Sequence, residues 1–220
     1  MGRLRHIAVP MKHLLPALLL TLLVGSPASA QSSSEAAAAA KPEAFLLLPE
    51  PRTMGSSRSM KPRGASETVL TPAREIPDSP GLAPYDAESF AKLGISPESF
   101  AQRARRVADA LLASLQPDWV YDEQGKLSYA VFRGERPIYA CLLCAPSLPR
   151  LFEKAFGEEI WLVAPDRHAL YVFPPHEATL QDFSADLAER FLTDPYAASC
   201  EIFSWKKGLV DPVVIGSFKP

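Results

Sequence analysis

Two cysteines separated by two residues, Cys141 and Cys144, form the motif with the clearest chemistry in this sequence. In an oxidising compartment a C-x-x-C pair can exchange thiols and disulfides, because helix N-terminal amides lower the pKa of a nearby thiol. If both residues lie in one β-strand, however, they point to opposite faces about 10 Å apart. A disulfide needs Cα atoms within about 7 Å. A thiol oxidoreductase at Cys141 and Cys144 is therefore kept as an alternative interpretation.

A third cysteine, Cys200, allows a structural disulfide with either Cys141 or Cys144. Such a bond fits an exported protein, because disulfides persist in oxidising compartments. The other interpretation is that these cysteines are buried free thiols. Three cysteines leave at least one unpaired within a monomer, so both interpretations predict a free thiol.

A second group of reactive residue types, Asp166, Arg167 and His168, follows Pro165 between two apolar runs. A loop on a rigid scaffold is a common place for binding residues, and these three are the candidate binding residues. An Asp–His pair beside a serine would resemble a catalytic triad, so a hydrolase is a further alternative. The sequence contains no G-x-S-x-G nucleophile motif. The simpler interpretation is a polar turn in which Arg167 pairs with Asp166 or another carboxylate.

No metal or cofactor site is predicted. His168 and His176 are eight residues apart, and they match no histidine or cysteine spacing of a zinc site. The sequence also lacks a glycine-rich phosphate-binding loop.

The apolar runs Ile160–Ala164 and Ala169–Phe173 are short and rich in β-branched and aromatic residues, which favours strands. Pro165 and Asp166 between them are turn-forming residues. The stretch 159–173 therefore predicts a β-hairpin. Because the runs are continuously apolar, we expect the hairpin to be buried on both faces and central in its sheet.

The remaining elements are expected to cover this hairpin. Strands are predicted at 119–121, 127–133, 137–144, 199–205 and 209–218, and helices at 87–92, 97–115, 148–156 and 178–192. Because short hairpins join most strands, the fold class is α+β. We expect one antiparallel sheet of about seven strands with three main helices, in the order α-βββ-α-ββ-α-ββ. Arg103, Arg105 and Arg106 lie off the apolar stripe of the second helix and indicate a solvated face or, alternatively, a binding patch.

Composition divides the chain into three parts. Residues 1–30 contain three basic residues, an eleven-residue apolar run at Leu14–Val24 and the triplet Ala28-Ser29-Ala30, as in a cleaved secretory signal. The run is too short for a membrane span, which needs about twenty residues. Residues 31–84 are rich in Pro, Ser and Ala and predict a disordered linker, in which Phe45–Leu48 is an incidental apolar patch or a short docking motif. Residues 85–220 are predicted to form a single domain.

The charge balance argues against nucleic-acid binding. The chain has 23 Lys and Arg against 25 Asp and Glu, and removing residues 1–30 leaves 20 against 25, a net charge of −5. A nucleic-acid binder would be expected to carry a basic patch or stripe. Membrane contact is expected only through an uncleaved signal.

Two resemblances add to this picture. Residues Leu93–Ser96 through Leu112, followed by Val163–Arg167 and Leu170, resemble the YtpQ-like family of bacterial proteins. That resemblance implies an early helix and a later strand–Pro–x–Arg–strand element, and it transfers no activity. The order α-β-β-β-α-β-β-α is similar to that of type III secretion chaperones. It implies that such a sheet can serve as a protein-interaction surface.

Together these observations predict an exported protein of the periplasm or the extracellular space. Its most consistent function is non-catalytic binding of a protein or a ligand. A thiol oxidoreductase and a hydrolase are the alternatives.

Overall fold

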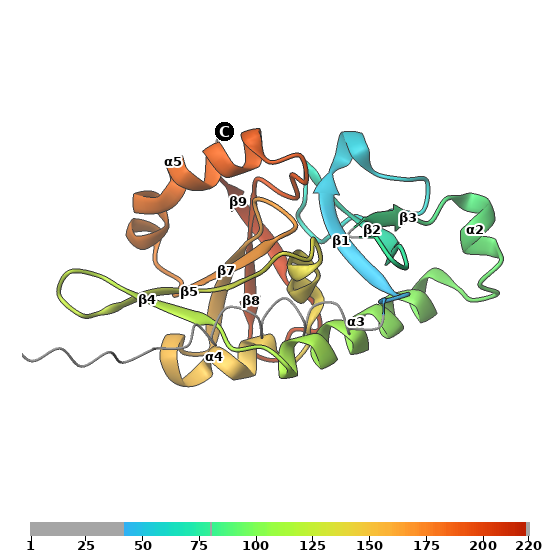
Figure 1. Cartoon of the computed structure of the whole chain (residues 1–220). Helices are drawn as coiled ribbons and strands as arrows, with labels where there is room; N and C mark the ends of the chain where they lie inside the picture. Colours follow the sequence, from blue (N-terminus) through green and yellow to red (C-terminus); the bar gives the residue numbers. More distant parts are fainter. Residues whose placement is uncertain (1–41, 80, 219–220) are drawn as a thin grey trace, which may run out of the picture. The chain divides into compact units, whose positions relative to one another are not determined.

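Two antiparallel β-sheets form the framework of the computed structural model, which describes residues 42–79 and 81–218 (Figure 1). The smaller sheet has the strand order β1-β2-β3, and the larger has the order β4-β5-β7-β6-β8-β9. The strands are β1 (Leu46–Pro51), β2 (Thr68–Glu75), β3 (Leu82–Pro84), β4 (Asp118–Tyr121), β5 (Leu127–Arg133), β6 (Glu159–Val163), β7 (Ala169–Phe173), β8 (Glu201–Lys206) and β9 (Val213–Ser217).

Helices cover both faces of the larger sheet, with α5 on one side and α4 on the other (Figure 1). The long helix α3 packs against β1 of the smaller sheet. The expected class, α+β, is confirmed. Within residues 42–79 and 81–218, no helix has the length and apolar character needed to cross a membrane. The helices are α2 (Ala87–Ala91), α3 (Pro97–Ala113), α4 (Leu148–Phe156), α5 (Glu177–Thr193) and the short 3-10 helices η1 (Arg52–Met54) and η2 (Tyr139–Cys144).

The predicted helix starts depend on local capping, and two of them are confirmed. Asp86 accepts a hydrogen bond from the backbone N–H of Ser89 at the start of α2, and Ser96 accepts one from Ser99 at the start of α3. Each bond satisfies a donor that the first helical turn leaves free. The helices predicted at 148–156 and 178–192 are present as α4 and α5.

The hairpin predicted at 159–173 is confirmed and lies at the centre of the larger sheet. β6 and β7 pair antiparallel with Trp161 opposite Phe173 and Val163 opposite Tyr171. Both faces are buried: Leu162 packs in the cluster beneath α4, whereas Val163 and Phe173 pack beneath α5. Burial on both faces explains why the two strands have no alternation of polar and apolar residues.

The strand predicted at 137–144 is wrong, because Tyr139–Cys144 forms the 3-10 helix η2. The N–H of Cys141 donates to the carbonyl of Ile138, a local bond typical of such a helix, while the N–H of Ala140 donates to the carbonyl of Arg167. A short apolar run is compatible with a buried strand or a buried helix, and periodicity does not distinguish the two. The expected single sheet of about seven strands is therefore corrected to sheets of three and six strands.

The linker predicted at 31–84 is also wrong for its described part, residues 42–79 and 81–84. Phe45–Leu48, interpreted as an incidental patch or a short docking motif, leads into β1. There Leu46, Leu47 and Leu48 are buried, and β1 packs against α3 and η2. The folded unit therefore begins before Tyr85. The predicted linker is polar overall, and such a composition by itself indicates disorder. The smaller sheet forms because segments distant in the sequence cover its apolar residues. The predicted signal at 1–30 and residues 31–41 lie outside the described residues.

Candidate functional site

The C-x-x-C pair lies on η2 and is buried. Cys141 and Cys144 have exposed fractions of 2% and 6%, and both are free thiols, as is the half-buried Cys200. Successive residues rise about 2 Å in a 3-10 helix, so the two Cα atoms are about 6 Å apart along its axis. The objection from strand geometry therefore no longer applies.

Burial nevertheless argues against a redox centre at this pair. Desolvation raises the pKa of Cys141 and raises that of Cys144 to about 12, so both remain protonated at neutral pH. Thiol exchange needs the thiolate. The alternative disulfide to Cys200 is not formed, and Cys200 packs in the separate cluster beneath α5.

The predicted binding residues Asp166, Arg167 and His168 are engaged in contacts that hold the hairpin turn. Asp166 is fully buried; its carboxylate accepts hydrogen bonds from the backbone N–H of His168 at 2.8 Å and from Nε of Arg190 on α5 at 2.9 Å. The imidazole of His168 lies with Nδ1 3.2 Å from the carbonyl of Gly134. Asp166 therefore contacts the backbone of His168 and not its ring, so the Asp–His part of a triad is not assembled.

Arg167 extends from the same turn to the smaller sheet, where its guanidinium forms an ion pair with Glu50 of β1. Both side chains are almost fully buried. Within the described residues, Nε of Arg167 and Oε2 of Glu50 have no hydrogen-bond partner. The expectation that Arg167 pairs with a carboxylate thus matches the structure, but the partner lies 117 residues away and joins two sheets.

His176 precedes α5 and is exposed. In the part of the chain that the structure describes, no three His, Cys, Asp or Glu residues are grouped to hold a metal ion.

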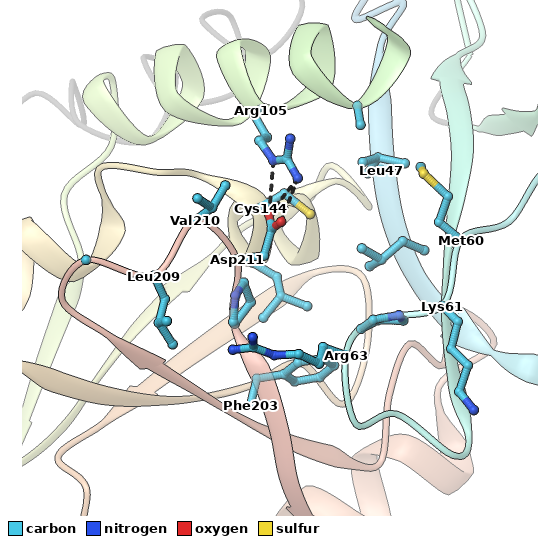
Figure 2. Close-up of a pocket in the computed structure, with 16 residues that line it drawn as sticks. Leu47, Met60, Lys61, Arg63, Arg105, Cys144, Phe203, Leu209, Val210 and Asp211 are labelled. Atoms are coloured by element: carbon cyan, nitrogen blue, oxygen red, sulfur yellow. Dashed lines mark hydrogen bonds and ion pairs between the residues drawn. The ribbon is translucent and has the colours of Figure 1, made fainter. Parts of the chain in front are cut away.

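A cavity of about 490 Å³ lies between α3, the smaller sheet, η2 and the connection from β8 to β9 (Figure 2). We call it the α3 cavity. Its floor consists of buried apolar residues from four elements, and its mouth is lined by charged residues. The floor includes Leu47 of β1, Ala101 of α3, Leu143 of η2 and Phe203 of β8, and the charged residues are Lys61, Arg63, Arg105 and Asp211.

One ion pair crosses the cavity. The guanidinium of Arg105 donates to both carboxylate oxygens of Asp211, with Nη2–Oδ distances of 2.7 and 2.8 Å and an Nε–Oδ1 distance of 3.0 Å (Figure 2). Cys144 lies close enough that the charge of Asp211 adds to the rise in its pKa, whereas Arg105 opposes it. The C-x-x-C motif therefore contributes to the cavity as an apolar wall.

The segment carrying Lys61 and Arg63 is fixed to the edge strand β9. The carbonyl of Arg63 accepts a hydrogen bond of 2.9 Å from the backbone N–H of Val214. Gly64 follows with φ +81°, and a Cβ at this position would lie 2.7 Å from the carbonyl oxygen of Val214. Only glycine adopts this left-handed conformation readily and leaves room for the carbonyl of Val214. Gly64 therefore fixes the segment that carries Lys61 and Arg63 at the mouth of the cavity.

Comparison of the chain with protein-family models, curated proteins and solved structures finds no match. The resemblances to the YtpQ-like family and to secretion chaperones therefore stay predictions.

Sequence reasoning did not identify the α3 cavity. Its lining comes from segments between Leu47 and Pro212 that are polar, apolar or mixed and share no motif. The one usable signal was the arginine group on α3. Arg105 pairs with Asp211, and Arg103 lies over the ring of Phe45 at 5.1 Å, so two of the three arginines have partners in the fold.

Proposed function

We propose that this chain is an exported, non-catalytic ligand-binding protein and that the α3 cavity is its binding site. The cavity carries the proposal, because its volume of about 490 Å³ lies within the range of about 300–1,000 Å³ that ligand pockets occupy. An apolar floor with a few convergent polar groups is the usual composition of such pockets. The contacts made by Asp166, Arg167 and His168 favour this site over the hairpin turn.

Export is supported by the sequence of residues 1–30, with its basic start, apolar run and small residues before Gln31. The negative net charge of the remaining chain is consistent with a soluble binding protein and not with a nucleic-acid partner. Expression of the full sequence in a bacterium and mass measurement of the exported product tests this part. The expected product begins at Gln31, and a product retained in the cytoplasm at full length would contradict export.

The binding proposal is tested with N-phenyl-1-naphthylamine, a neutral apolar dye that fluoresces in apolar surroundings. The exported protein should bind it saturably at one site. Ala101→Leu adds three carbons at the cavity floor and should weaken binding about tenfold, or 1.4 kcal/mol. Gln102→Leu, the same new side chain at the exposed neighbouring position, is the matched control and should leave the affinity unchanged.

Two results would refute the α3 cavity as the site. One is the absence of saturable dye binding to protein that unfolds cooperatively. The other is a dye affinity that Ala101→Leu leaves unchanged or changes no more than Gln102→Leu does.

A further inference from the structure

We propose that the ligand of the α3 cavity is an apolar carboxylate whose carboxylate group binds Arg105 in exchange for Asp211. This inference rests on the proposed function and adds the chemical class of the ligand and the group that it displaces. Asp211 would then be an internal competitor that occupies the anion position when no ligand is bound.

The geometry of Arg105 defines the ligand group. Asp211 meets the guanidinium side-on, with its two oxygens accepting from Nη2 and one of them also accepting from Nε. The planar guanidinium matches a planar carboxylate in this arrangement. The carboxylate of Asp211 therefore shows that a group of this shape fits the position.

The exposure of the two partners favours exchange. The side chain of Arg105 is 27% exposed, whereas that of Asp211 is 51% exposed. Displaced Asp211 would return to water at little cost, because exposed ion pairs contribute only about 0–1 kcal/mol. Arg105 would stay partly buried, and its positive charge would need an anion in the position that Asp211 leaves.

The charge of the mouth also favours an anion. The residues lining the cavity include three cations, Lys61, Arg63 and Arg105, and one anion, Asp211. Among the described residues, neither Lys61 nor Arg63 forms an ion pair. Figure 2 shows Arg63 and Phe203 on the side of the cavity opposite Arg105. A bound carboxylate would thus have positive charge on both sides.

The apolar part of the ligand follows from the floor and from the connection that carries Asp211. Leu47, Leu143 and Phe203 line the cavity and are buried, while Leu209 and Val210 line it with exposed fractions of 37% and 72%. An alkyl chain on this floor would cover part of the exposed apolar surface, at about 0.8 kcal/mol for each buried CH₂. Inorganic anions and very short acids have no alkyl chain to bury and would not gain this free energy.

The test is displacement of bound N-phenyl-1-naphthylamine at neutral pH, where a carboxylate is ionised. Decanoate, decanol, acetate and inorganic phosphate are compared. Decanoate should displace the dye with about tenfold higher affinity than decanol, and acetate and phosphate should fail at the same concentrations. Equal affinities of decanoate and decanol, or displacement by acetate or phosphate, would overturn the proposed ligand class. Because the dye is neutral, its binding tests the cavity separately from the carboxylate.

Two substitutions test the exchange itself. Asp211→Asn removes the competing anion and should strengthen decanoate binding about threefold or more without changing decanol. Arg105→Met should abolish the preference for decanoate. Asp182→Asn, at an exposed position on α5, is the control for the loss of one negative charge and should have no effect. An Asp211→Asn variant that unfolds cooperatively and binds decanoate no better than the unmodified protein would overturn the exchange.

Discussion

Glu201, the first residue of β8, accepts a hydrogen bond of 3.0 Å from the backbone N–H of Thr68, the first residue of β2. The same carboxylate accepts from the N–H groups of Ser66 and Glu67 and from the hydroxyl of Ser66. Glu201 is 2% exposed. This buried carboxylate therefore attaches the smaller sheet to the larger one, next to the segment that brings Lys61 and Arg63 to the α3 cavity.

Glu201→Gln should lower the free energy of unfolding by about 2–4 kcal/mol at neutral pH, because an amide presents donors to a site composed of donors. Chemical denaturation measures the change. Glu158→Gln, at a side chain that is 79% exposed, is the control and should change stability by less than about 0.5 kcal/mol. Equal stabilities of the two variants would show that the bonds to Ser66–Thr68 contribute nothing.

The same residue predicts a pH dependence. Burial alone would raise the pKa of the Glu201 carboxyl, but the hydrogen bonds from Ser66, Thr68 and Glu67 together lower it below its ordinary value of 4.5. A lowered folded-state pKa means that this stabilisation is present above pH 4.5 and is lost as the pH falls through the folded-state pKa. The stability difference between the unmodified protein and Glu201→Gln should therefore shrink in acid. A difference that stays constant down to pH 3 would contradict this.

The buried pair Glu50–Arg167 should behave differently from an exposed pair. Arg167→Met leaves the carboxylate of Glu50 buried without its partner and should cost about 3–5 kcal/mol of stability. The double variant Glu50→Leu with Arg167→Met should recover a large part of that loss, because no buried charge remains. Arg133→Met, which breaks an exposed pair with Asp118, is the control, with an expected cost of about 0–1 kcal/mol. Additive losses in the double variant would refute the coupling of Glu50 and Arg167.

Gly64→Ala should distort the cation-bearing segment. Alanine pays about 1–2 kcal/mol for a left-handed backbone conformation, and here its Cβ also meets the carbonyl oxygen of Val214. Gly125→Ala is a matched control, because Gly125 has φ +77° and open space around the added Cβ. Gly64→Ala should therefore be more destabilising than Gly125→Ala and should weaken dye binding, which the control should not do. Equal effects of the two substitutions would show that the approach to Val214 imposes no constraint.

The three thiols should differ in reactivity. A disulfide reagent added to the native protein should modify Cys200 first, because it is half-buried whereas Cys141 and Cys144 are buried. Burial raises the pKa of all three thiols, so the reaction should accelerate as the pH rises. Cys200→Ser should remove the fast phase. Rapid modification of Cys141 or Cys144 in the native protein would instead support the oxidoreductase alternative.

The amino-acid sequence alone determined the elements that depend on neighbouring residues. The helix starts at Asp86 and Ser96 follow from local capping. Each side chain accepts a hydrogen bond from the backbone N–H three residues later. The hairpin of β6 and β7 follows from two apolar runs separated by turn residues. Its central place in the larger sheet was also predictable, because a continuously apolar strand needs cover on both faces.

Only the tertiary structure decided the smaller sheet, the 3-10 helix η2 and the α3 cavity. α3 and η2 bury β1, and β2 pairs with β1. Their local composition therefore resembles that of a linker until those partners are in place. The pairs Glu50–Arg167 and Arg105–Asp211 join residues more than 100 positions apart, and the sequence contains no pattern that relates them. A binding site assembled from such distant segments depends on how the chain packs, because the spacing of residues specifies only contacts close in sequence.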